Sequence, residues 1–474
     1  MALPVNDYYA RSTSGDVAGG RLLVPPSLAP LLNQIAAAQE NSWLKVNTND
    51  YSDVWPAEDF RPHYPSASSN ATPSPTAVIR AWSSFGWDDT RARLVLWGGG
   101  HANYNGNEVY VWDGSTRQWS LAFYPSDVKD AYDYPASQQP IDGTLNAPQS
   151  SHTFGNNQYL PILDRFITFG GAAQPSGGAL VVQDGTGHTL RAAGAYTLDL
   201  TLAGQGYVGG TTGSNPKRGA SAGVNLPGAS AWQLRDYFLD HPNTAVVSYL
   251  KSHTSGITAY RQENGHDVLY VETGPAGAGL NLMRIEFVDH DYRNDILSMA
   301  GYAYSANPYW QGGDLDSVSG VLMHLNGRGG NLMEGFNLNH VGYNVQVPLS
   351  AANGPAAATV TALVNGSTDM TMCFDEKRNR FVIWGRGGDL YAMRTPSNLA
   401  EITSNWYCET IVSDPAPRPK NNFELGSFGD GSEKDSGAMG KWKRSKLLDV
   451  YVALQGCFSG DVWMFKPAGW TDPR

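Results

Sequence analysis

The stretch Arg93-Leu94-Val95-Leu96-Trp97, followed by Gly98-Gly99-Gly100, recurs in altered form along this chain. Arg165-Phe166-Ile167-Thr168-Phe169 runs into Gly170-Gly171, and Arg380-Phe381-Val382-Ile383-Trp384 runs into Gly385, Gly387 and Gly388. Each copy follows a polar turn. An apolar run of this length between a turn and a glycine cluster is typical of a short buried strand. Its recurrence predicts small sheets arranged as radial blades, each incomplete without its neighbours.

The composition agrees with an all-β chain. Charged residues make up 16% of the 474 residues and aromatic residues 11%, and there are 53 glycines. Globular domains carry about 25% charged residues, so this chain has few ion-paired helix faces and many buried strands and tight turns. The length favours two to four domains, but a ring of sheets grows by adding blades instead.

The net charge of −11 disfavours nucleic acid and anionic lipid as ligands. The densest cationic run, Lys441 to Lys446, is expected in a solvated turn. Cys373, Cys408 and Cys457 lie too far apart in the sequence for a disulfide framework and are expected as buried free thiols. We find neither a signal peptide nor an apolar stretch of about 18 residues, so we expect a soluble protein made in a cytoplasm, without a membrane span.

The N-terminal part, residues 1–41, is expected to form an irregular arm and one short helix, Leu28 to Gln39. Residues 42–474 are expected to form a β-propeller, with a strand at 42–47 and blades at about 76–470. Each blade should hold four antiparallel strands, named a to d from the centre outward. Predicted a strands include Ile79–Trp87, Ser151–Tyr159 and Ser436–Trp442.

Two of the predicted groups are irregular. The second has a d strand near Gly206–Gly210 and a short helix at Trp232–Leu239, and the fourth shows no clear a strand. Six blades is the expected count, with seven as the alternative if the long loops hide one.

The sixth group ends without an outer strand, and proteins avoid such an unpaired edge. The spare strand at 42–47 is available to fill it. We therefore predict that the ring closes by pairing of the N-terminal strand with the last blade.

The pattern of an apolar strand, a glycine pair, and then a Tyr and a Trp on the next strands resembles kelch repeats. It is carried by Gly99-Gly100, Tyr110 and Trp119, and by Gly387-Gly388, Tyr391 and Trp406. The resemblance covers about residues 76–470 and implies a six-bladed propeller. The stretches Trp43-Leu44-Lys45-Val46-Asn47 and Ser151-His152-Thr153-Phe154 are similar to kelch-like proteins of bacteriophage and proteobacteria.

In a propeller, the b–c loops and the connections from d to the next a share one face, where the channel opens. Residue types that bind sugars gather in those segments, since rings pack on sugar faces and polar groups bond hydroxyls. The candidate ligand-binding residues at this mouth are Trp82, His101, Asn103, Tyr104, Asn107, Glu108, His152, His253, Asp369 and Arg386, with Asp435 beside them. The alternative for each is a loop brace that bonds the backbone.

Three of these candidates are histidines from different blades, which raises the question of a metal site. A copper-radical oxidase of the galactose-oxidase type shares the propeller architecture, but it needs a cysteine linked to a tyrosine. None of the three cysteines is placed convincingly beside a tyrosine, so we expect no metal and no cofactor.

The leading hypothesis is a non-enzymatic bacteriophage virion protein of a tail or fibre. It would bind a host surface glycan or a partner virion protein through the propeller face, and anchor to virion proteins through its N-terminal arm. The alternatives are a carbohydrate-active enzyme, either an oxidase or a polysaccharide depolymerase, and a scaffold without a ligand.

Overall fold

The computed structural model describes most of the chain. The described residues are 24–57, 74–101, 104–126, 128–130, 138–140, 142–173, 177–184, 186, 188–203, 231–252, 256–273, 281–300, 312–325, 332–338, 344–348, 352–366, 370–395, 405–413, 415–427 and 432–474.

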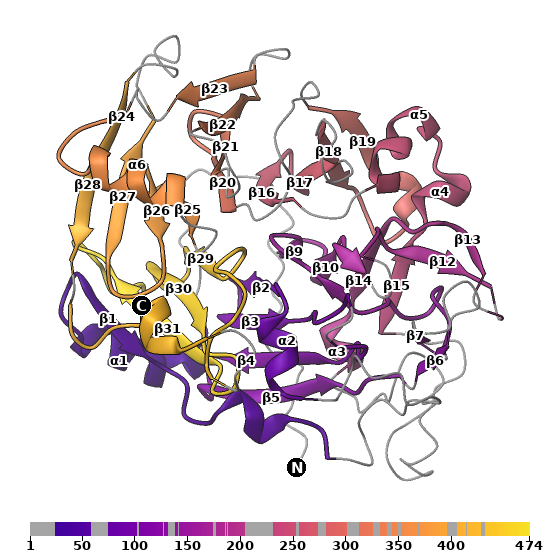
Figure 1. The fold of residues 1–474 in the computed structure, drawn as a ribbon, viewed down its shortest axis with the longest axis horizontal. Helices are drawn as coiled ribbons and strands as arrows, with labels where there is room; N and C mark the ends of the chain where they lie inside the picture. The colour runs from indigo at the N-terminus through magenta and orange to yellow at the C-terminus, as the bar shows by residue number, and fades with distance from the viewer. Residues whose placement is uncertain are drawn as a thin grey trace.

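Six antiparallel sheets follow one another around a ring in chain order, which makes the protein a six-bladed β-propeller (Figure 1). The first three blades are built as follows. Blade 1 holds β2 (Phe85–Asp88), β3 (Arg93–Leu96), β4 (Val109–Asp113) and β5 (Gln118–Phe123). Blade 2 holds β9 (Asn157–Leu160), β10 (Arg165–Thr168), β14 (Ala195–Leu198) and β15 (Trp232–Arg235). Blade 3 holds β16 (Thr258–Glu263), β17 (His266–Thr273), β18 (Asn281–Phe287) and β19 (Ile296–Met299).

The remaining three blades complete the ring. Blade 4 holds β20 (Gly312–Asp316), β21 (Val321–Leu325), β22 (Leu332–Asn337) and β23 (Asn344–Pro348). Blade 5 holds β25 (Thr371–Asp375), β26 (Arg380–Trp384), β27 (Leu390–Arg394) and β28 (Trp406–Val412), with β24 (Ala352–Asn353) added in parallel at its outer edge. Blade 6 holds β29 (Trp442–Ser445), β30 (Val450–Gln455) and β31 (Asp461–Lys466), and its outer strand is β1 (Ser42–Lys45).

Short elements fill the connections. Three two-stranded ribbons pair β6 (Val128–Asp130) with β7 (Gln138–Pro140), β8 (Ser151–His152) with β11 (Ala172–Ala173), and β12 (Val181–Gln183) with β13 (Thr189–Ala192). The helical segments are η1 (Pro26–Leu28), α1 (Ala29–Ala37), η2 (Tyr51–Val54), α2 (Thr76–Arg80), α3 (Leu200–Ala203), α4 (Tyr237–Asp240), α5 (Thr244–Val247), η5 (Ser248–Ser252), η6 (Tyr292–Asn294), α6 (Ala357–Gly366) and α7 (Asn422–Leu425). No helix within the described residues is long and apolar enough to cross a membrane.

The predicted ring closure is confirmed. Strand β1 pairs antiparallel with β31, from Ser42 opposite Lys466 to Lys45 opposite Trp463. The indigo and yellow ends of the chain therefore lie in one blade in Figure 1. Trp43 supports the pairing from the face turned to blade 5, where its ring packs on Trp384 and Trp442 and its Nε1 donates to the Gly388 carbonyl over 2.8 Å.

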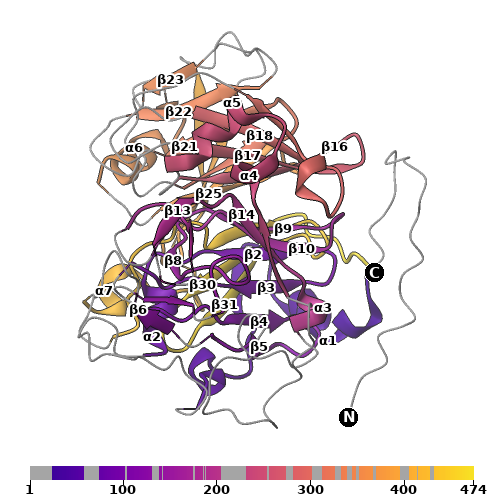
Figure 2. The same cartoon turned by 90° about the vertical axis from the view of Figure 1, so that its right-hand side faces the viewer.

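The predicted N-terminal helix is also present, as η1 followed by α1. Leu31, Leu32 and Ile35 are buried in one apolar cluster with residues of blades 1 and 6. The Lys466 ammonium donates to the carbonyls of Ala36 and Ala38 at the end of the helix. Figures 1 and 2 both show the C-terminus close to α1, where Arg474 reaches Asn33. The helix is thus part of the propeller core.

Several predicted strand limits are wrong, mostly where glycine-rich loops join blades. The first a strand begins at Phe85, since residues 76–80 form α2, and the second begins at Asn157. The predicted helix at Trp232–Leu239 is instead β15 followed by α4. Gly206–Gly210, predicted as the outer strand, lies outside the described residues.

The end of the chain needs two further corrections. The a strand of blade 6 is β29, which begins six residues later than predicted. Most of the cationic run 441–446 therefore lies in a strand and not in a solvated turn, and Lys441 is buried. Blade 4 does have an a strand, β20, because buried Leu315 anchors a segment otherwise made of Gly and Asp. The three cysteines are buried and free, as predicted.

The first prediction concerns ring closure. Trp43→Ala should lower the free energy of unfolding by about 3–5 kcal/mol, because it removes a large buried ring and strands the Gly388 carbonyl. Urea unfolding followed by tryptophan fluorescence measures this. Lys45→Ala, in the same strand but at a partly exposed side chain paired only with Asp461, should cost at most about 1 kcal/mol. Equal losses for the two variants would contradict the proposed role of Trp43.

Candidate ligand-binding site

The six a strands, β2, β9, β16, β20, β25 and β29, stand nearest the ring axis and line the channel. Since each is antiparallel to its b strand, all six a–b turns lie at one end of the channel. The b–c loops and the connections between blades lie at the other end, on the side where Figure 2 shows α2 and α7. The channel therefore has two chemically distinct ends.

At the b–c end, three of the predicted site residues meet. The Trp82 ring lies 4.6 Å from the His152 ring, and the His101 ring lies 5.3 Å from His152, edge-on. The backbone φ angles of Trp82 and His101 are 53° and 47°, a region that bulky side chains rarely adopt. Trp82, His101 and His152 thus form one compact aromatic group held by strained loops, which we call the His152 cluster.

The glycine pairs of the repeat make this packing possible. Gly171 has φ of 152°, and a Cβ placed on it would lie 1.8 Å from the carbonyl oxygen of His152. Only glycine allows the loop after β10 to approach β8 this closely. The repeat that predicted the fold therefore also fixes the His152 cluster.

His152 is neutral at physiological pH. Its side chain is buried, and this desolvation, together with the neighbouring His101, lowers the pKa of His152 to about 3. The neutral imidazole packs between two aromatic rings and also has a hydrogen bond with the Gly100 backbone. The His152 cluster therefore serves mainly to hold these loops together.

The other predicted residues of blade 1 are buried within their own loop. Tyr104, Asn107 and Glu108 are almost fully inaccessible. The Asn107 amide bonds the Pro148 carbonyl and the Ser126 backbone N–H, and Glu108 accepts from the Tyr110 hydroxyl over 2.9 Å. Such contacts are those of loop braces.

Arg386 lies in a buried charged group. It forms an ion pair with Asp435, which also lies 3.1 Å from the Lys441 ammonium. Lys441 in turn donates to the carbonyls of Ile79 and Gly437. These side chains tie blades 5 and 6 to α2. Asn103, His253 and Asp369, also predicted as site residues, lie outside the described residues.

A wide space in the channel lies at the opposite end, among the a–b turns. It is a cavity of about 550 Å³. Towards the b–c end the channel narrows to a space of about 10 Å³. Asp314 and Lys443 line both spaces, so they lie at the floor of the wide cavity.

All six blades contribute to the wall of this cavity. In chain order, the lining residues are Trp87, Asp89 and Thr90; Gln158, Tyr159, Pro161 and Ile162; Tyr260, Arg261 and Gln262; Asp314, Leu315 and Ser317; Phe374 and Glu376; and Lys443, Arg444 and Lys446. The wall thus combines aromatic rings, amides and charges of both signs. We call it the turn-end cavity.

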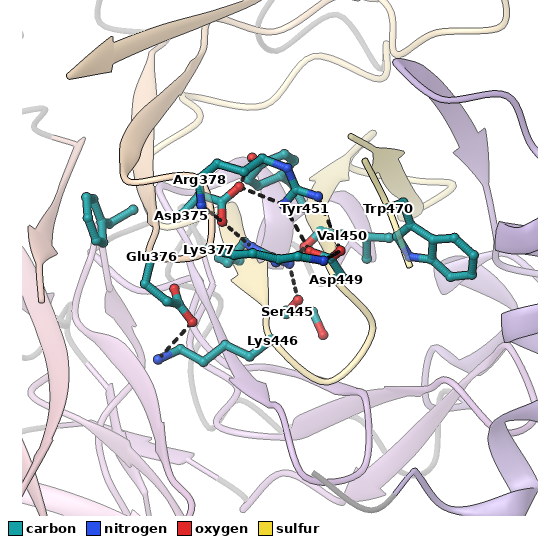
Figure 3. Close-up of polar contacts among 12 residues, drawn as sticks. Asp375, Glu376, Lys377, Arg378, Ser445, Lys446, Asp449, Val450, Tyr451 and Trp470 are labelled. Carbon is teal, nitrogen blue, oxygen red and sulfur yellow. Dashed lines mark hydrogen bonds and ion pairs between the residues drawn. The ribbon is translucent and has the colours of Figure 1, made fainter. Parts of the chain in front are cut away.

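Most cations of the turn-end cavity have acidic partners. Arg444 pairs with Asp375 of blade 5 and with Asp449 of its own blade. Lys446 lies 3.2 Å from Glu376 (Figure 3). Arg261 pairs with Glu263 over 3.4 Å. These charges compensate one another in place, so they add little net field to the cavity.

The carboxylates Asp89 and Asp314 are instead held by neutral donors. Asp89 accepts from the Trp87 indole, the Ser445 hydroxyl and the Lys446 backbone N–H. Asp314 accepts from the backbone N–H groups of Leu315 and Phe374, each over 2.8 Å. Burial raises the pKa of both carboxyls, and these hydrogen bonds oppose that shift.

The sequence analysis did not single out the turn-end cavity. The polar residues at 88–90 and 375–379 indicated only the turns that precede two copies of the repeat. The basic run at 441–446 was expected in a solvated turn. The available signal was topological: residues at the ends of all six a strands converge at one end of a propeller channel.

Among the described residues, no group of three His, Cys, Asp or Glu side chains is arranged to hold a metal ion. Cys373 and Cys408 lie in strands β25 and β28, and Cys457 follows Gly456. Burial raises the pKa of all three thiols, which keeps them protonated and unreactive.

Comparison with known proteins gives little further guidance. No protein-family model matches the chain. No curated protein matches it either. A chain of the solved structure titled "Crystal Structure of Mitotic Checkpoint Complex" is similar at 9% identity, covering 87% of this chain and 96% of that one, with a TM-score of 0.29. Similarity at this level carries no argument about function.

The second prediction concerns acid sensitivity. Between about pH 6.5 and pH 3 the unfolded chain binds a proton at His152 that the folded protein does not. The free energy of unfolding should therefore decrease as the pH is lowered through this window. His152 should contribute about 1.4 kcal/mol per pH unit to this decrease. His152→Gln should show a shallower fall between pH 7 and 5 in urea unfolding. Phe423→Ala, at an exposed side chain that does not titrate, should leave the wild-type profile. An unchanged profile for His152→Gln would contradict the assignment.

Proposed function

We propose that this protein is a non-enzymatic carbohydrate-binding propeller of a bacteriophage tail or fibre, and that it holds a host surface glycan in the turn-end cavity. The observation that carries the proposal is the cavity itself, at which all six blades place rings, amides and hydrogen-bonding charges around one space.

The cavity suits a sugar in size and chemistry. Sites for small ligands commonly measure about 300–1,000 Å³, and this one measures about 550 Å³. Trp87 and Tyr260 offer ring surface for the apolar faces of sugar rings, and Gln262 offers an exposed amide for hydroxyls. The wall is built from strand ends, so it is pre-formed and costs little ordering on binding.

The virion setting rests on the sequence. The glycine pairs with following Tyr and Trp resemble kelch repeats, and the segments around Trp43 and His152 are similar to kelch-like proteins of bacteriophage and proteobacteria. In this proposal the segment before residue 24 attaches the propeller to a virion protein.

The third prediction tests glycan binding and its location. The double variant Arg261→Ala, Gln262→Ala should bind bacterial surface glycans about tenfold more weakly than the wild type, because it removes two hydrogen-bonding groups from the rim. A printed array of lipopolysaccharide and capsular glycans measures this. The control is Phe423→Ala, at a side chain that is 97% exposed on α7, at the b–c end. Equal losses for the two variants would refute the location, and no binding by the wild type would refute the function.

The fourth prediction tests the virion setting. Gold-labelled antibodies against the purified propeller should decorate the tails or fibres of particles whose genome encodes this chain. A virion component occupies a defined place in the particle, so electron micrographs should show label at a fixed position. Particles without label, with the protein recovered only from the lysate supernatant, would refute a virion role.

A further inference from the structure

The floor of the turn-end cavity holds two opposite charges that do not pair. Lys443 and Asp314 lie on the a strands of blades 6 and 4, and both border the point where the channel narrows. Within the part of the chain that the structure describes, the Lys443 ammonium makes neither a hydrogen bond nor an ion pair, while Asp314 accepts only from two backbone N–H groups.

The two charges nevertheless influence each other. Burial lowers the pKa of Lys443, and the negative charge of Asp314 opposes that shift. Burial raises the pKa of Asp314, and the charge of Lys443 is among the effects that oppose it. Both side chains are half-buried, so the Lys443 amine borders the cavity without a direct partner among the described residues.

The geometry points to a neutral sugar as the ligand, bound at the floor through two adjacent hydroxyls. Lys443 Nζ donates to the oxygen of one hydroxyl, and the Asp314 carboxylate accepts from the other. This inference rests on the proposed glycan-binding function and specifies its ligand class.

Charge balance is the reason to prefer a neutral ligand to an anionic one. Lys443 and Asp314 cancel each other, and the cations Arg261, Arg444 and Lys446 are paired with Glu263, Asp375, Asp449 and Glu376. An anion next to Lys443 would also lie near the Asp314 carboxylate, and like charges in a desolvated site repel. A hydroxyl can act as both donor and acceptor, so a pair of hydroxyls satisfies both groups without adding charge.

The test uses the same glycan array, printed with three copies of each glycan: native, carboxyl-reduced, and treated with periodate, which cleaves the carbon–carbon bond between adjacent hydroxyls. The full-length wild type should bind neutral glycans, bind carboxyl-reduced copies at least as well as their acidic parents, and lose the periodate-treated copies. Lys443→Gln should bind about tenfold more weakly or worse, because a hydrogen bond from a charged donor is lost.

The control variant is Lys45→Gln, at a partly exposed side chain on the outer strand of blade 6, outside the cavity lining, whose partner is Asp461. It should bind within about twofold of the wild type. Thermal unfolding of Lys443→Gln checks that the variant is folded; since Lys443 bonds no described residue, its melting temperature should not fall.

The outcomes separate the two claims. Three outcomes would overturn the neutral-diol inference while glycan binding stands. They are undiminished binding by Lys443→Gln, loss of binding when the carboxylates of the glycan are reduced, and binding that survives periodate treatment. A wild type that binds no copy of any glycan overturns both.

Discussion

The structure depends on closing a ring whose first and last strands come from opposite ends of the described chain. Four residue pairs between β1 and β31 make that closure. Sheets in a propeller gain most of their stability from neighbouring blades, so an open ring would expose two apolar faces. Trp43 is placed to prevent this, since it contacts aromatic rings of both blade 5 and blade 6.

A second set of contacts repeats around the a–b turns. Asp267 of blade 3 accepts from the backbone N–H groups of Ile162 and Leu163 in the turn of blade 2. Asp89 of blade 1 accepts from the backbone N–H of Lys446 in the turn of blade 6. Asp314 of blade 4 accepts from the backbone N–H of Phe374 in blade 5. Carboxylates thus join neighbouring blades at the end of the channel where the cavity lies. The same residues that set the spacing of the blades therefore also shape the proposed binding site.

The sequence predicted the ring of six blades, but it did not predict the turn-end cavity. The repeat at 93–100, 165–171 and 380–388 identified the b strands because their burial follows from a short apolar run. The a strands were harder, since β20 and β29 carry the polar groups that line the channel and so do not look like strands. For the same reason Lys443 was expected in a solvated turn. The predicted site residues instead included histidines beside glycines. The structure packs one of these, His152, between the rings of Trp82 and His101.

The narrow neck below Asp314 and Lys443 has a consequence for how long polymers can be recognised. A space of about 10 Å³ holds roughly one water molecule, so this neck between the described residues has no room for a sugar ring. A ligand in the turn-end cavity would therefore enter and leave by the opening among the a–b turns. If the protein binds a glycan there, as we propose, only a chain terminus or a short side branch would reach Asp314 and Lys443. The number of binding sites on a cell would then depend on the number of free glycan ends at its surface, and not on the total mass of its surface polysaccharide.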